Sequence, residues 1–151
     1  MIAFFLPITP PKATSQGAGK RIIVIAGKPM FFKSGKAQGA ENDLTLLCSR
    51  HIPAQPMEGA LCLQIDFTFP WRKSEPQKRL VLGRVPHTSK PDCSNLVKMI
   101  EDVLTKLGFW KDDSQIASLT VTKAWGDKVG IAVRIDHFPT SIPRTELFTK
   151  S

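Results

Sequence analysis

Residues 90–116 read K-P-D-C-S-N-L-V-K-M-I-E-D-V-L-T-K-L-G-F-W-K-D-D-S-Q-I. Apolar residues recur at helical spacing in this stretch, which predicts an amphipathic helix over about 94–107. One face of that helix carries Leu96, Val97, Ile100, Val103, Leu104 and Leu107. Gly108 fits the end of the helix, because glycine readily adopts the positive φ found there. The pattern therefore predicts a helix packed on a core and followed by a strand over 116–125.

The clearest strand lies at 60–69, where apolar and polar residues alternate with the period of a half-buried strand. Its apolar set is Leu61, Leu63, Ile65, Phe67 and Phe69. The segment 129–135 alternates in the same way, and we expect it to form a hairpin with 116–125. A polar loop is predicted from Pro70 to about Pro91.

The N-terminal third adds a strand at 1–6, a loop at 7–20 and a strand at 21–26 that pairs back with 30–33. A helix is predicted over about 37–50, with Leu44, Leu46 and Leu47 facing inward. The order predicts a single α/β (α+β) domain with a mixed sheet and two main helices. Helices on one sheet face would leave the other face open for a ligand or a second subunit. We expect the domain to cover 1–138 and a tail to follow over 139–151.

Composition narrows the class of partner. The formal net charge of +8 favours a polyanion, most often nucleic acid, over a merely soluble basic protein. Three dispersed cysteines form neither a disulfide framework nor a zinc pattern, and they suit a reducing cytoplasm. No apolar run is long enough to span a membrane. The chain lacks a P-loop and a G-x-S-x-G elbow, and it has no tyrosine, which excludes tyrosine recombinase chemistry.

Acidic residues bracket the predicted helix. Asp92 precedes it, Asp112 and Asp113 follow it, and Lys98 projects from its first turns. Carboxylates beside a lysine suit metal-dependent phosphodiester hydrolysis, because Mg²⁺ binds few carboxylates and keeps several waters. A helix of about 18–20 Å and a six-residue return of about 20 Å can just bring Asp113 near Asp92. Otherwise the second acid comes from a partner subunit.

The structural alternative needs no catalysis. Asp92 would cap the helix, Asp112 and Asp113 would form a turn, and Lys98 would pair with Asp102 four residues on.

Cations gather on both sides of this stretch, and such loops can follow DNA phosphates. The predicted DNA contacts are Arg72, Lys73, Lys78, Arg79, Arg84 and Lys90, with Lys12 and Lys20 from the N-terminal loop. A solvated basic face is the alternative. Phe109 and Trp110 could stack on unpaired bases, but we expect them to pack in the core.

These residues resemble a known family, the RusA-type Holliday junction resolvases, which are small phage and prophage endonucleases. The family carries a D-x-D-N-x-x-K motif leading into a helix, then an aromatic residue and D-D-x-Q. The corresponding residues are Asp92, Cys93, Ser94, Asn95, Lys98, Phe109, Trp110, Asp112, Asp113 and Gln115. The close match covers the 27 residues of 90–116, and the flanking strands agree in order.

The resemblance implies a RusA-like fold and a homodimer acting on branched DNA in recombination and repair. Paired symmetric nicks across a four-way junction would use Mg²⁺, for which Mn²⁺ can substitute. It also implies that Asp92 and Asp113 are catalytic metal ligands and that Lys98 is the catalytic cation. Asp112, Ser94 and Asn95 would be supporting residues.

The chain departs from the family motif at Ser94, where the second acid is expected. A neutral hydroxyl is a weaker Mg²⁺ ligand, so metal affinity should fall. Ser94 could ligate directly or through water, Asp112 or Glu101 could compensate, or Ser94 could simply cap the helix. A further alternative is a junction-binding protein with weakened or lost catalysis. An RNA-binding or interaction protein that reuses the fold is a more distant one.

Overall fold

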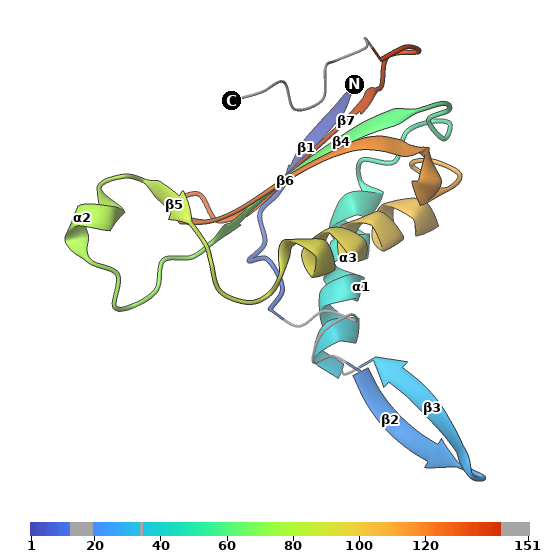
Figure 1. The fold of residues 1–151 in the computed structure, drawn as a ribbon, viewed down its shortest axis with the longest axis horizontal. Coiled ribbons are helices and arrows are strands. Elements are labelled where there is room, and N and C mark those ends of the chain that lie inside the picture. The colour runs from blue at the N-terminus through green and yellow to red at the C-terminus, as the bar shows by residue number, and fades with distance from the viewer. Residues whose placement is uncertain (13–19, 34, 143–151) are drawn as a thin grey trace, which may run out of the picture.

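Strand β4 (Leu61–Phe69) lies at the centre of a five-stranded sheet (Figure 1). The computed structural model describes residues 1–12, 20–33 and 35–142. The order across the sheet is β1 (Ile2–Leu6), β7 (Gly130–His137), β4, β6 (Ile116–Gly126) and β5 (Arg84–Pro86). β6 runs parallel to β4, and all other neighbours are antiparallel. The sheet is therefore mixed, as the order of the predicted elements indicated.

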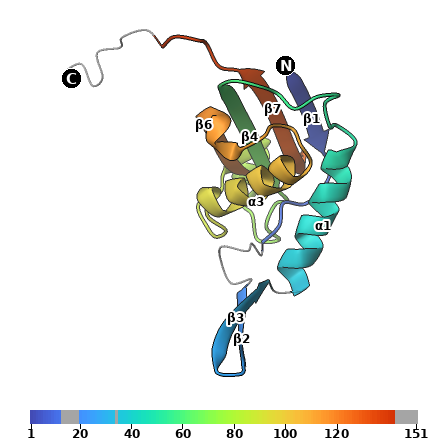
Figure 2. The same cartoon turned by 90° about the vertical axis from the view of Figure 1, so that its right-hand side faces the viewer.

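Two long helices, α1 (Gly35–Ser49) and α3 (Cys93–Lys106), cover the same face of this sheet (Figures 1 and 2). The alternate residues of β4 that face the helices are fully buried: Leu61, Leu63, Ile65, Phe67 and Phe69. They meet the apolar face of α3, where Leu96, Val97, Ile100, Val103 and Leu104 are buried. Both predictions of periodicity are confirmed, and the core lies between β4 and α3.

Within the part of the chain that the structure describes, no helix covers the opposite face of the sheet. Gln64 of β4 and Arg134 of β7 are exposed there, and their backbones are paired in register. The expectation of one covered face and one open face is confirmed.

The predicted hairpin of 116–125 with 129–135 is wrong. β6 and β7 do not pair with each other, because β4 lies between them. The connection from Gly126 to Gly130 instead crosses the end of β4. Alternation fixes which face a strand presents to the core, but it does not fix which strand is its neighbour. The strand with the most apolar inner face, β4, takes the central position.

The polar loop predicted up to Pro91 also contains regular structure. A short helix α2 (Gln77–Leu80) and β5 lie within it, and β5 pairs with the end of β6. The prediction that Leu46 of α1 faces inward was wrong as well: Leu44 is buried, but Leu46 is 63% exposed. Leu46 lies two positions after Leu44, which places it on nearly the opposite side of a helix.

The predicted N-terminal hairpin is confirmed as β2 (Lys20–Ile25) paired with β3 (Lys28–Lys33), which extends away from the sheet (Figure 1). Residues 13–19 of the predicted loop, and 143–151 of the predicted tail, lie outside the described residues. Among the residues described, no helix is long and apolar enough to cross a membrane.

Candidate active site

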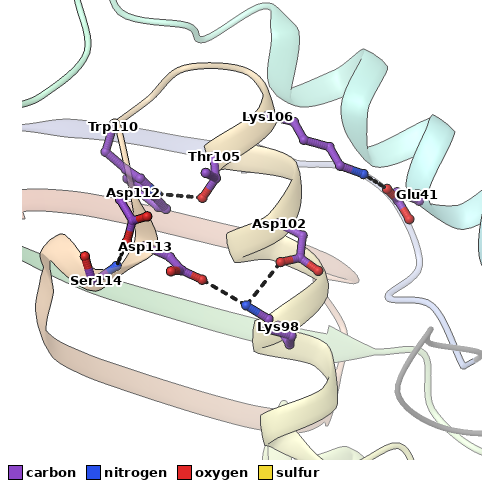
Figure 3. A network of polar contacts seen from close by, with 9 residues as sticks. All are labelled: Glu41, Lys98, Asp102, Thr105, Lys106, Trp110, Asp112, Asp113 and Ser114. Carbon is purple, nitrogen blue, oxygen red and sulfur yellow. Dashed lines mark hydrogen bonds and ion pairs between the residues drawn. The ribbon is translucent and has the colours of Figure 1, made fainter.

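Lys98 is the centre of a charged cluster on the exposed side of α3 (Figure 3). Its Nζ lies 2.8 Å from Oδ2 of Asp113 and 3.2 Å from Oδ1 of Asp102. The three side chains are about one-third to two-fifths exposed, so solvent and a ligand can both reach them. The structure therefore joins one acid that follows the helix to the lysine near its start.

The return of the chain after α3 explains how Asp113 reaches Lys98. Gly108 ends the helix with a φ of +80°, and the Phe109 amide donates back to the carbonyl of Leu104. Phe109 and Trp110 are fully buried, and Trp110 Nε1 donates to Thr105 Oγ1 at 2.7 Å. These two aromatic side chains anchor the returning chain to the core and cannot stack on bases. The expectation that they pack in the core is confirmed.

Gln115 then fixes the acidic turn before β6. Its Oε1 accepts from the amides of Lys111 and Asp112, and its Nε2 donates to the carbonyls of Met57 and Gly59. One side chain thus ties the turn to the loop ahead of β4. The sequence contained this residue in the D-D-x-Q segment, but its role as a tether needed the structure.

The two adjacent acids have different roles. Asp112 caps the short 3₁₀ helix η1 (Asp113–Gln115), and its carboxylate accepts from the Ser114 amide at 2.8 Å. Hydrogen bonds from Ser114 hold the pKa of Asp112 below its usual value. Asp113, in contrast, faces Lys98. Asp112 is therefore a turn residue, whereas Asp113 belongs to the cluster.

Electrostatics around Lys98 favour a permanent positive charge. Hydrogen bonds first to Asp113 and then to Asp102 raise the pKa of Lys98 far above its usual value. The neighbouring Glu101 has a raised pKa, mainly because burial disfavours its charged form. The charge of Lys98 opposes that rise, while Asp113 and Asp102 add to it. Three carboxyl groups thus act on one another around a single cation.

Asp92 occupies the N-cap position of α3, but within the described residues its side chain makes no capping hydrogen bond. The carboxylate is more than half exposed, and its Oδ2 lies 4.0 Å from Nζ of Lys90. The alternative that Asp92 is simply a helix cap is thus met by its backbone, which begins α3, but not by its carboxylate, which is exposed to solvent. Within the described residues, no hydrogen bond or ion pair joins Asp92 to the Lys98 cluster.

Ser94 and Asn95 both lie in the first turn of α3. Ser94 is exposed and follows the first helical residue, so it is not the helix cap. Ser94, Lys98 and Asp102 are spaced four residues apart, which places them along one side of the helix. Within the described ranges, no group of three or more His, Cys, Asp or Glu side chains is arranged to hold a metal ion.

The predicted DNA-binding cations fall into two groups. Arg72 and Arg79 both pair with the buried Glu75, at 3.0 and 3.1 Å, and Arg84 pairs with Asp66 at 3.2 Å. The other predicted cations with described side chains are exposed: Lys12, Lys73, Lys78 and Lys90. The side chain of Lys20 is not among those that the structure describes. The lysines thus point to solvent, while these arginines also hold local structure.

His87 is a packing residue at the base of this basic segment. Its ring stacks on Trp125 with centroids 3.8 Å apart, and its Nδ1 accepts from the Ser89 amide. Burial, followed by the positive charge of Lys123, lowers the pKa of His87. The ring is therefore neutral at neutral pH. The Nζ of Lys123 also donates to the carbonyls of Ser89 and Pro91, which fixes the approach to α3.

One surface depression among the described residues lies beside the acidic turn, and it does not contain the Lys98 cluster. Its lining includes Glu58, Lys111, Asp112 and Gln115, but neither Lys98 nor Asp113. A site that acts on a polymer backbone needs an accessible surface more than an enclosed cavity, and the exposure of Lys98 meets that need.

Comparison with known proteins gives a consistent result. The family model described as Endodeoxyribonuclease RusA matches residues 9–136. The chain is 44% identical over 117 residues to a protein of Lactococcus phage r1t named crossover junction endodeoxyribonuclease rusA. That alignment covers 77% of this chain and 84% of the phage protein. A Bacillus subtilis (strain 168) protein named YqaN, described as uncharacterised, is 28% identical over 114 residues, which are 72% of this chain and 80% of YqaN.

Proposed function

The chain belongs to the RusA family of endodeoxyribonucleases, and we propose that it resolves Holliday junctions by paired, symmetric, Mg²⁺-dependent nicks made by a homodimer. The observation that carries this proposal is the contact of Lys98 with Asp113 and Asp102. Family membership supports the DNA substrate and the endonuclease reaction. The cluster supports the location of the chemistry.

The available donors suit a hard divalent cation. Asp113 and Asp92 present partly exposed carboxylates. Within the described residues, the Asp92 side chain makes no capping hydrogen bond to α3. Mg²⁺ typically takes only one or two carboxylates and completes its coordination with waters and substrate phosphates. Asp92 and Asp113 would hold the ion, and the ion would supply a Lewis acid and an activated water.

Lys98 acts on the phosphate in this proposal. Because its pKa is raised, it stays protonated and donates a hydrogen bond, and it does not serve as a base. Its target is the scissile phosphate or the 3′ oxygen that leaves when the P–O3′ bond breaks. Asp102 gives Lys98 Nζ a second acceptor, which keeps the ammonium in place when Asp113 turns to another partner.

A homodimer follows from the form of the substrate. A four-way junction has approximate two-fold symmetry, and two equivalent cuts need two equivalent sites, which a two-fold dimer provides. We further propose that residues 1–138 form the catalytic domain, followed by a tail over 139–151, and that the protein works in the cytoplasm. The last strand ends at His137, which supports the domain boundary.

The proposal is tested with a labelled synthetic four-way junction incubated with the full chain. We expect two symmetric nicks with Mg²⁺ or Mn²⁺, no product with chelator, and little cutting of a linear duplex of matched sequence. Restoring Mg²⁺ after chelation should restore the nicks. Equal cutting of junction and duplex, or products that persist in chelator, would contradict the proposal.

Ser94 favours a second candidate, a protein that binds junctions but cuts them slowly or not at all. Because serine stands where the family motif has its second acid, the side of α3 that carries Lys98 has one negative charge fewer than the motif provides. Asp112 does not compensate readily, because its carboxylate is engaged with Ser114.

The variant Ser94→Asp separates the two candidates. An acid four residues before Lys98 joins the cluster, so we expect the metal concentration for half-maximal cutting to fall by about tenfold or more. Mn²⁺ binding measured by calorimetry should tighten by a similar factor. Cys93→Asp adds the same charge to a neighbouring exposed position, and we expect it to change neither quantity. Equal effects of both variants would show that net charge alone is responsible.

A further inference from the structure

Residues 71–90 form an arch that leaves the end of β4, carries α2 and β5, and returns to α3. In Figure 1 this arch extends past the edge of the sheet, with α2 at its outer end. The arch is held in one shape. Trp71 Nε1 donates to Asp127 Oδ1 at 2.7 Å, and the Asp127 amide donates to the carbonyl of Gly83 at 3.1 Å. Strand β5 pairs with β6 at its return.

The outer surface of the arch is strongly positive. Six lysines and arginines accompany one acid, Glu75. The side chain of Glu75 is 1% exposed and lies between Arg72 and Arg79, so its charge is turned inward. Lys73 and Lys78 are exposed, and among the described residues neither has an ion-pair partner. The arch therefore presents lysines that no local carboxylate neutralises.

Two aliphatic side chains lie at the turn that follows α2. Val81 is 72% exposed and Leu82 is 67% exposed. Gly83 closes this turn with a φ of +75°, and a Cβ there would lie 3.4 Å from Oδ2 of Asp127. The turn is thus fixed against the sheet, and its fixed geometry directs Val81 and Leu82 into water. A constrained turn that exposes two aliphatic residues among cations matches a ligand that is both anionic and apolar.

We propose that Val81 and Leu82 form an apolar wedge that contacts the unstacked bases at the branch point, while Lys73 and Lys78 bind the flanking phosphates. The inference rests on the proposed function and adds a residue-level origin for the preference for branched DNA. Other DNA-binding proteins insert aliphatic side chains between neighbouring base pairs and partly unstack them, and such contacts do not depend on the base sequence. A paired duplex offers phosphates to the lysines but no open base faces to the wedge.

Charge favours DNA over a second copy of the chain at this surface. Two arches brought together would place their lysines side by side, and the repulsion between these like charges would oppose association. DNA phosphates would instead attract the same lysines. DNA satisfies both the cations and the aliphatic pair. A second copy would satisfy only the aliphatic pair.

The test uses a four-way junction with 2-aminopurine at the branch point, in chelator, so that no cutting occurs. Binding of the full wild-type chain should raise the fluorescence as the base unstacks. The double variant Val81→Ser with Leu82→Ser should lose most of that rise. It should also bind the junction about tenfold more weakly, the scale of the contacts of one base. Its affinity for linear duplex should be unchanged.

Two control variants separate the wedge from the cations. Leu46→Ser removes an equally exposed leucine from α1, and we expect neither fluorescence nor affinity to change. Lys73→Ala and Lys78→Ala should weaken junction and duplex alike, with each reducing the slope of log K against log salt by about 0.9.

The outcomes distinguish this inference from the proposed function. If the wedge variant keeps the full fluorescence rise and the junction preference, the inference is overturned while the nuclease assignment stands. If the wedge variant changes the dimer to a monomer in sedimentation, the surface is a subunit contact and the inference is likewise overturned. If the wild-type chain shows no junction preference at all, the proposed function itself fails.

Discussion

Asp113→Asn should reduce metal-dependent cutting of a four-way junction by at least about 100-fold, the scale of removing one preorganised electrostatic group. The amide keeps the size of the side chain and can still accept from Lys98. It loses the charge that attracts a divalent cation. Junction binding without metal should be preserved or tightened, because a negative charge facing phosphate is removed. The measurement is the single-turnover nicking rate at saturating metal, beside a binding titration in chelator.

The neighbouring acid gives a matched control. Asp112→Asn changes the same functional group one residue earlier, but asparagine also accepts a capping hydrogen bond and suits the N-cap position. We therefore expect the Asp112→Asn rate to stay within a few fold of wild type. If the two variants lost activity equally, the acidic turn would act as a unit and the separate role given to Asp113 would be wrong.

Lys98→Met should lower the rate at saturating metal by about 100- to 1,000-fold, because the donor to the phosphate is lost. Its effect on metal binding should be opposite in direction to its effect on rate. Removing the ammonium leaves Asp113, Asp102 and Glu101 without their shared cation, so the cluster attracts a divalent ion more strongly. Calorimetric titration with Mn²⁺ should show binding at least as tight as in wild type.

The split between rate and metal affinity is what identifies Lys98 as a group that acts on substrate. A purely structural role would instead lower stability and weaken both properties together, which thermal unfolding would reveal. Lys111→Met, at an exposed lysine that lies 3.4 Å from Glu58, serves as the control. We expect its saturated rate to stay within a few fold of wild type.

Local patterns predicted the main elements because they depend only on neighbouring residues. The alternation in 60–69 and the helical spacing in 94–107 each report one buried face, and both faces meet in the core. The same reasoning failed for β6 and β7, because strand order depends on contacts between distant segments. It also missed β5, a strand of three residues that exists only because the end of β6 offers it a partner.

The candidate site shows the same division. The D-x-x-N-x-x-K and D-D-x-Q segments marked Lys98 and Asp113, and their contact spans 15 positions in the sequence. Asp102 was expected to be an ordinary helical partner of Lys98. The structure adds that Asp102 shares this lysine with Asp113. The resemblance gave Asp113 and Asp112 different roles, and the structure adds the physical difference: Asp112 caps the 3₁₀ helix, whereas Asp113 contacts Lys98 on α3.

The sequence by itself determined the family, the two buried faces of the core, the basic character and the set of acidic and cationic residues available for chemistry. These properties follow from composition, short-range periodicity and a motif, which do not require knowledge of distant contacts. The tertiary structure decided the central place of β4, the exposure of Val81 and Leu82, the inward turn of Glu75 and the grouping of Asp113 with Lys98 and Asp102. Each of these depends on where the chain returns after a turn, and that return is set by packing between segments far apart in the sequence.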